Sequence, residues 1–247
     1  MEKTYTESFV VRSTDCDQFR KMRLDALFTA MQEGGEHHAH LLGVGHAEML
    51  DRGLFFALTR IHVSMLRAPR AGETVVHQTW PGNANRFFCP RYHVFTLEDG
   101  TPLVAAGSLW VMLDVNQRQI VSPEKVELNF PDNSDLPAPI SIQMRLPALR
   151  NEPQTSVRTP VYSEFDINGH VNNAKYIAWL CDALGRQTFE HAIIGDLVAG
   201  YEREIRKETP MNLQLSRDGD AFSFKVCSQS GDKHFVAGGT LRQEEAL

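Results

Sequence analysis

Apolar and polar residues follow the same order twice along this 247-residue chain. Each time, a stretch with apolar residues at helical spacing comes first, over residues 22–42 and again over residues 171–189. Side chains three and four positions apart share one face of a helix, so both stretches predict a long helix with one buried face. Gly34 and Gly35 fall inside the first helix, and we expect them to interrupt or weaken it.

Runs typical of β-strands follow each helix. They are rich in β-branched and aromatic residues, and turn signals such as Asp99-Gly100 and Asp218-Gly219 separate them. We expect strands at residues 54–66, 74–80, 87–97 and 103–114 in the first half, and at 197–205, 211–215, 221–228 and 234–241 in the second. One long helix followed by consecutive antiparallel strands predicts a sheet wrapped around that helix, here in two copies.

A proline-rich stretch lies between the two copies. Seven of the twelve prolines fall between Pro123 and Pro160, and the stretch has little sustained periodicity. A loop of this length is unusual inside one compact domain but natural between two. We therefore expect a first domain at residues 1–125, a linker at 126–155 and a second domain at 156–247.

The two halves also align residue by residue. Placing Asp17 on Asp166 puts Met22 on Val171 and continues through both helices. Polar residues of the second copy have no counterpart in the first, because Phe19 replaces Asn168 and Lys21 replaces His170. If the repeat is real, the chemistry belongs to the second half, and the first half is structural or shapes the substrate pocket.

Polar side chains gather just before the second helix. Asp166, Asn168 and His170 stand two positions apart, and side chains two apart in an extended segment face the same way. The free N–H groups at the start of the helix favour negative charge nearby. A carboxylate, an amide and an imidazole at such a place indicate a hydrolytic site, and the alternative is a polar turn built by Asn and Gly.

The run from Asp166 to Tyr176, DINGHVNNAKY, resembles the D-x-x-x-H-V-N-N-x-x-Y signature of hotdog-fold thioesterases. Its D-x-N-x-H version is similar to the acyl-ACP thioesterases, which terminate fatty acid synthesis. Weaker similarity to that family runs through the first half, at residues 58–62, 70–73, 79–80, 86–87 and 107–114. The resemblance implies an α+β double hotdog, with two tandem antiparallel sheets each wrapped around a long helix. The first domain would carry a degenerate site and the acyl-chain pocket.

The resemblance implies four catalytic residues, Asp166, Asn168, His170 and Glu204. Glu204 matches the glutamate of a Tyr-x-x-Glu-Cys segment that family members carry on a strand facing the site. Two hydrolytic routes stay open: Asp166 with Glu204 polarises a water, or Asp166 attacks the thioester carbonyl itself. His170 would serve as general base or protonate the leaving thiolate, and Asn168 would hold the imidazole or donate to the oxyanion.

One position departs from the family pattern. Ile205 stands where the family has cysteine, so a Cys–His–Asn arrangement cannot operate there. Cys181 is a possible substitute, but its place within the predicted helix favours a small buried apolar residue.

Three residues that follow His170 match the family motif and are expected to bind substrate. They are Asn172, Asn173 and Tyr176, although asparagine at a helix start is also ordinary capping chemistry. The His37-His38-x-His40 cluster invites a metal-binding interpretation, but no HExxH motif accompanies it. Thioester cleavage needs no metal, and we expect no cofactor.

The charged residues of the chain limit which classes of macromolecule it can bind. The net charge of −6 argues against a nucleic-acid partner. The resemblance implies acyl carrier protein, which presents its acyl chain on a phosphopantetheine arm and is itself acidic. Docking it would need a local basic patch, and the sequence offers three candidates: Arg67 with Arg70, Arg86 with Arg91, and Arg203 with Arg206 and Lys207.

The remaining expectations concern location and alternatives. The N-terminus is polar, no apolar run reaches transmembrane length, and the four cysteines form no CxxC pair. These features predict a cytoplasmic protein without membrane insertion. The hotdog resemblance implies either a monomer, because a tandem hotdog already forms the two-domain unit within one chain, or a homodimer, because hotdog sheets often pair further. An acyl-CoA thioesterase and a non-catalytic acyl-binding hotdog protein are the alternative functions. The sequence does not indicate which acyl chain length the protein prefers.

Overall fold

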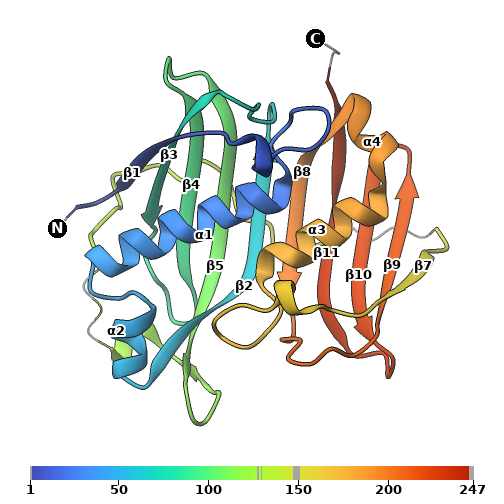
Figure 1. Ribbon diagram of the computed structural model, residues 1–247. Helices are drawn as coiled ribbons and strands as arrows, with labels where there is room; N and C mark the ends of the chain where they lie inside the picture. Colours follow the sequence, from blue (N-terminus) through green and yellow to red (C-terminus); the bar gives the residue numbers. More distant parts are fainter. Residues whose placement is uncertain (1, 127, 129, 147–150, 245–247) are drawn as a thin grey trace.

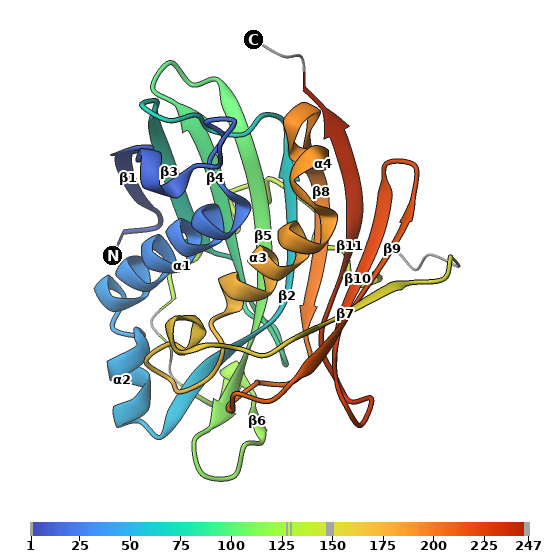
Figure 2. The ribbon, with the colours of Figure 1, turned by 45° about the vertical axis from the view of Figure 1, so that its right-hand side comes forward.

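The computed structural model describes residues 2–126, 128, 130–146 and 151–244. Within these residues, one large antiparallel sheet carries two long helices on the same side (Figures 1 and 2). The helices are α1 (Leu24–Leu41), α2 (His46–Asp51), α3 (Asn173–Leu184) and α4 (Arg186–His191). The strands are β1 (Tyr5–Val10), β2 (Leu54–Met65), β3 (Thr74–Pro81), β4 (Cys89–Leu97), β5 (Pro102–Asp114), β6 (Ile120–Val121), β7 (Gln154–Arg158), β8 (Ala192–Tyr201), β9 (Met211–Asp218), β10 (Ala221–Ser228) and β11 (Lys233–Gln243).

The two halves share one sheet, with strand order β1-β3-β4-β5-β2-β8-β11-β10-β9-β7 and β6 beside β5. Helix α1 crosses the strands of the first half and α3 crosses those of the second (Figure 1). The predicted α+β plan of a sheet around a long helix in each half is therefore correct. The expectation of two separate sheets needs correction, because β2 pairs with β8 from Arg60↔Gly200 to Ser64↔Asp196. Each strand thereby satisfies backbone groups that an exposed edge would leave unpaired.

Helix α1 runs without a break through Gly34 and Gly35, so the expected interruption is wrong. Both glycines are buried where the helix approaches the sheet. A Cβ atom built on Gly34 would lie 2.5 Å from Cε1 of His77 on β3. Because glycine has no side chain, α1 can approach the sheet closely here. The close packing of helix against sheet outweighs the low helix propensity of glycine. The second predicted helix is divided into α3 and α4 at Gly185, whose φ is +82°.

Several strand limits differ from the expected ones. Strand β8 begins at Ala192 and ends at Tyr201, whereas a strand over residues 197–205 was expected. The edge strands β1 and β7 were not predicted at all. Strand β7 is mostly exposed, so its sequence carries no strong alternation of buried and exposed residues, and its pairing with β9 defines it.

The connector crosses the sheet on the face that α1 does not cover. Ala106 packs into the core beneath α1, so its neighbour Gly107 faces the opposite side. There, the side chains of Ile140 and Ile142 lie close to Gly107, and the carbonyl of Ser141 is 2.8 Å from His62 Nδ1. Residues 127, 129 and 147–150 of the expected linker, and residues 1 and 245–247, lie outside the described residues. The division into domains at 125 and 156 stays a proposal.

The core lies between the helices and the sheet. Helix α1 buries Leu27, Phe28 and Met31, while α3 buries Ile177 and Leu180, with α1 and α3 in contact. Burying each such side chain contributes roughly 1.5–3 kcal/mol, which is why the amphipathic pattern specifies both helices. Among the described residues, no helix is long and apolar enough to cross a membrane.

Candidate active site

A tight turn, and not an extended segment, brings the polar residues before α3 together. The N–H of Gly169 donates to the carbonyl of Asp166 at 3.0 Å, and the N–H of Asp166 donates to the carbonyl of His170 at 3.0 Å. Gly169 has a φ of +70°, a conformation that glycine adopts without steric cost. The expectation of side chains alternating along a strand is therefore wrong. Asp166 and His170 meet because the chain folds back between them.

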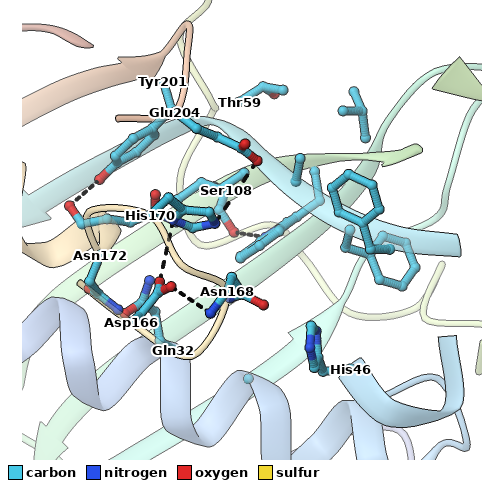
Figure 3. Close-up of a pocket in the computed structure, with 18 of the residues that line it drawn as sticks. Gln32, His46, Thr59, Ser108, Asp166, Asn168, His170, Asn172, Tyr201 and Glu204 are labelled. Carbon is cyan, nitrogen blue, oxygen red and sulfur yellow. Dashed lines mark hydrogen bonds and ion pairs between the residues drawn. The ribbon is translucent and has the colours of Figure 1, made fainter. Parts of the chain in front are cut away.

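Two carboxylates flank the imidazole of His170 (Figure 3). Oδ2 of Asp166 lies 3.5 Å from Nδ1, and Oε1 of Glu204 lies 4.0 Å from Nε2. The side chains of Asp166 and His170 are each 17% exposed, so both are largely shielded yet reachable from the pocket. Nδ1 therefore has two neighbours, the carboxylate of Asp166 and the carbonyl of Val171 at 3.3 Å, while Nε2 faces Glu204. Such an arrangement suits general acid–base chemistry.

Glu204 reaches the site from a loop and not from a strand. Strand β8 ends at Tyr201, so the predicted strand position of Glu204 is wrong. The carboxylate is held by Arg206, whose Nη2 and Nε lie 2.5 and 2.8 Å from Oε2, and Arg118 Nη1 lies 3.5 Å from Oε1. Ile205, at the family's cysteine position, is buried, and its carbonyl accepts a hydrogen bond from the N–H of Val171 at 2.8 Å. This bond fixes the loop against the start of α3.

Asn168 is exposed and acts here through its backbone. Its N–H donates to Oδ1 of Asp166 at 2.9 Å, and its carbonyl accepts from Nη1 of Arg206 at 3.3 Å. Within the part of the chain that the structure describes, its carboxamide makes no hydrogen bond to His170. Asn168 therefore positions Asp166 in this structure, and donation to a substrate oxyanion stays a prediction.

The three expected substrate-binding residues line the same pocket, but each also has a structural contact. Asn172 caps α3, because its side-chain oxygen accepts from the N–H of Ala174 at 2.8 Å. The carbonyl of Asn173 accepts from the hydroxyl of Tyr201 at 3.1 Å. Tyr176 stacks on Phe235 with ring centroids 5.1 Å apart, and burial raises the pKa of its phenol. Contact with substrate stays a prediction for all three.

The site opens into a pocket of about 1890 Å³ that both halves of the chain line. Helix α1 contributes Phe28 and Met31, and β2 contributes Leu58 and Ile61. These apolar side chains can contact an apolar part of a ligand, and His170 with its two carboxylates lines the same pocket. The prediction that the first half carries the acyl-chain pocket stays a proposal.

Residues missed or misplaced by the sequence lie around this pocket. Arg118 was not singled out, because no local pattern connects it with a site formed far along the chain. Arg91, expected in a docking patch, is partly buried in the pocket wall beside Thr79 and His38, and desolvation lowers its pKa to about 10. Cys181 does not line this pocket. As the sequence predicted, it packs against the core, and burial raises the pKa of its thiol, which makes it a poor nucleophile.

The first half repeats the turn without the chemistry. The N–H of Asp17 donates to the carbonyl of Lys21 at 2.8 Å, and Oδ1 of Asp17 accepts from the N–H of Phe19 at 2.8 Å. Arg20, with a φ of +64°, occupies the place of Gly169. Nζ of Lys21 lies 3.1 Å from Oε2 of Glu244, so a buried ion pair involves the residue that replaces histidine. In the residues with a described position, no three His, Cys, Asp or Glu side chains are grouped to hold a metal ion.

Comparisons with known proteins match both halves of the chain to one family. Residues 2–127 match the model of the acyl-ACP thioesterase N-terminal domain, and residues 149–241 match that of the C-terminal domain. A dodecanoyl-[acyl-carrier-protein] hydrolase of Cinnamomum camphora is 29% identical over 90% of this chain and 62% of its own length. A palmitoyl-acyl carrier protein thioesterase of Gossypium hirsutum is 30% identical over 83% of this chain and 53% of its own. The chain spans just over half the length of several curated relatives that it matches.

Solved structures confirm the double hotdog fold. An acyl-ACP thioesterase from Bacteroides thetaiotaomicron superposes with a TM-score of 0.88 at 22% identity, covering 97% of this chain and 98% of that one. The 12:0-ACP thioesterase from Umbellularia californica superposes with a TM-score of 0.84 at 25% identity, covering 99% of both chains.

Proposed function

Because the chain belongs to the acyl-ACP thioesterase family, we propose that it hydrolyses fatty acyl-ACP to free fatty acid and ACP, terminating fatty acid synthesis. The observation that carries this proposal is the imidazole of His170 held between Asp166 and Glu204 at the mouth of a large pocket with apolar walls. The pocket would hold the acyl chain and place its thioester carbonyl beside the imidazole.

The hydrogen bonds around Asp166 favour the water route over direct attack. Oδ1 accepts a hydrogen bond from the N–H of Asn168, and Oδ2 lies 3.5 Å from Nδ1 of His170 as its ion-pair neighbour, so each carboxylate oxygen already has a polar neighbour. A nucleophilic Asp166 would have to give up one of them. In the water route, Asp166 orients the ring, and Nε2 of His170 takes a proton from a water near Glu204. The water oxygen then bonds to the carbonyl carbon, the carbon–sulfur bond breaks, and the imidazolium gives the proton it took from water to the leaving thiolate.

Acyl carrier protein is the proposed partner, delivering its acyl chain on the phosphopantetheine arm. Most of the predicted basic patch residues have acidic neighbours: Arg67 pairs with Glu73, Arg203 with Asp232 and Arg206 with Glu204. Arg86 lies over the ring of Phe87, near the pocket-lining Phe88. Arg86 and Lys207 are therefore the cations we propose for docking, since neither has an acidic partner among the described residues. A homodimer and a cytoplasmic location stay predictions, and the curated relatives named above are chloroplastic.

The proposal is tested by steady-state hydrolysis of matched C8 to C18 acyl-ACP and acyl-CoA substrates. Asp166→Asn is compared with Asp17→Asn, which alters the equivalent turn of the first half. We expect a preference for ACP esters, a loss of about 10²–10⁴-fold in kcat for Asp166→Asn, and near-normal kcat for Asp17→Asn. Equal turnover of CoA esters would indicate a general acyl thioesterase. No turnover of any thioester would overturn the proposal and favour an acyl-binding protein.

A further inference from the structure

Arg118 belongs to the first half but reaches the carboxylate of Glu204 in the second. It lies in the turn between β5 and β6, where the side chain of Asp114 accepts the N–H groups of Asn116 and Gln117 at 2.8 and 2.7 Å. The N–H of Arg118 donates to the carbonyl of Asp114 at 3.0 Å. The turn is therefore ordered up to Arg118 by its own hydrogen bonds.

The backbone of Arg118 adopts a conformation that non-glycine residues rarely occupy. Its φ is +55°, which costs conformational free energy for a residue with a Cβ atom. The guanidinium lies over the ring of Phe55, with 4.9 Å between its carbon and the ring centroid. A cation over an aromatic face is attracted to it, and the planar group is held in one orientation. Both features direct the guanidinium to a defined place at the pocket.

The two oxygens of Glu204 are divided between two arginines. Arg206 holds Oε2, and Arg118 Nη1 lies 3.5 Å from Oε1, the oxygen that is 4.0 Å from Nε2 of His170. Glu204 stands in a loop beyond the end of β8, so strand pairing does not hold its side chain in place. Without Arg118, only Arg206 would orient the carboxylate, and nothing would keep Oε1 toward the imidazole.

We propose that Arg118 is a positioning residue, which acts through Glu204 to hold that carboxylate beside His170. The inference rests on the proposed thioesterase function and on the role of Glu204 in it. It also gives the first half a part in the chemistry besides the acyl pocket. A displacement of about 1 Å in a catalytic group can cost about 10²-fold in rate, so a residue that only orients can have a large effect.

The test compares Arg118→Met, Arg118→Lys, Glu204→Gln and the double variant Arg118→Met/Glu204→Gln, with Arg12→Met as control. Arg12 is an exposed arginine that pairs with Asp15 and does not line the pocket. For each variant, kcat and KM are measured on the best acyl-ACP substrate, and thermal unfolding verifies the fold. The lysine variant keeps the charge without the planar group and preserves the test should the methionine variant fail to fold.

We expect Arg118→Met to lower kcat about 10- to 100-fold with little change in KM, and Arg118→Lys to recover part of the loss. In the Glu204→Gln background, Arg118→Met should lower kcat by almost no further amount, because the carboxylate that it positions is already absent.

Two results would overturn the inference. One is a kcat for Arg118→Met that stays within twofold of the wild-type value. The other is a loss that multiplies with that of Glu204→Gln, or falls on KM alone, since Arg118 would then act independently of Glu204. Wild-type protein that turns over no thioester would refute the proposed thioesterase function. An active wild-type protein with an unaffected Arg118→Met variant would refute only the role of Arg118.

Discussion

Lys21 and His170 occupy equivalent places in the two halves, and their carbonyl oxygens accept the same hydrogen bond, 2.8 Å from the N–H of Asp17 and 3.0 Å from that of Asp166. The backbone turn is therefore common to both halves, whereas the side chains differ. His170 faces two carboxylates at a pocket, but Lys21 is buried and forms an ion pair with Glu244. The repeat explains how one of two similar turns serves stability while the other supplies the candidate chemistry.

The ion pair of Lys21 predicts a stability effect without a catalytic one. Both side chains are at least 90% buried, so Lys21→Met leaves the carboxylate of Glu244 with only the N–H of Ala68, at 3.2 Å, and the more distant guanidinium of Arg70, at 3.9 Å. We expect a loss of about 3–5 kcal/mol in the free energy of unfolding, measured by urea denaturation. The double variant Lys21→Met/Glu244→Gln should regain much of it, and kcat of the folded protein should stay near wild type. An unchanged urea midpoint in Lys21→Met would contradict this account.

His170 predicts a catalytic effect without a large stability effect. His170→Ala removes the proposed general base from a partly accessible position. We expect kcat to fall about 10²–10⁴-fold while the unfolding midpoint changes little. His191→Ala, an exposed histidine on α4, is the control and should keep full activity. Comparable activity of the two variants would remove His170 from the mechanism.

The glycine pair in α1 predicts two different outcomes for the same substitution. In Gly34→Ala, the new Cβ atom would meet His77 at 2.5 Å and Glu7 at 2.7 Å, so helix or sheet must shift. We expect a loss of about 1–3 kcal/mol in stability by thermal or urea unfolding. Gly35→Ala meets the flexible side chain of Arg91 at 3.3 Å, and the helix propensity of alanine offsets this contact. Equal stability of both variants would show that the close packing at Gly34 is not a constraint.

Three buried histidines predict acid sensitivity. Burial lowers the pKa of His38, His77 and His93, and the nearby guanidinium of Arg91 adds to the effect. The unfolded chain therefore binds more protons once the pH falls below about 6.5. Their contribution to stability is complete above that pH and is lost as the pH falls, by about 1.4 kcal/mol per pH unit for each proton involved. Urea unfolding between pH 8 and 5.5 should show this slope, and His93→Gln should reduce it. An identical slope in both proteins would count against the prediction.

His62 predicts the opposite dependence. Burial disfavours its charge, but hydrogen bonds to Asp196 at 3.0 Å and to the carbonyl of Ser141 at 2.8 Å outweigh burial and raise its pKa. Its contribution is therefore complete below about pH 6.5 and is lost as the pH rises through the raised pKa. We expect His62→Phe to release the connector at Ser141, with a loss of about 1 kcal/mol that is larger at pH 6 than at pH 9. Limited proteolysis at the two pH values measures the release of the connector, and urea unfolding measures the loss of stability. Equal cleavage rates of variant and wild type would refute the prediction.

Local patterns accounted for much of the fold and for half of the site. Helical spacing located α1 and α3, alternation and turn residues located most strands, and the two copies were visible from Asp17 and Asp166. The pairing of Asp166 with His170 also followed from the sequence, because both lie in one short motif. The backbone conformation that brings these two residues together did not follow from the sequence. An extended segment was expected, whereas the structure has a turn closed by two backbone hydrogen bonds.

Tertiary structure decided what joins distant parts of the chain. The pairing of β2 with β8 merges two sheets into one, and the place of Glu204 depends on where β8 ends and how the following loop returns to α3. Arg118 reaches that carboxylate across the junction between the halves. Hydrophobic periodicity records which face of a segment is buried, but it carries no information about which segments meet. Contacts between residues far apart along the chain arise only when sheet pairing and loop geometry bring them together.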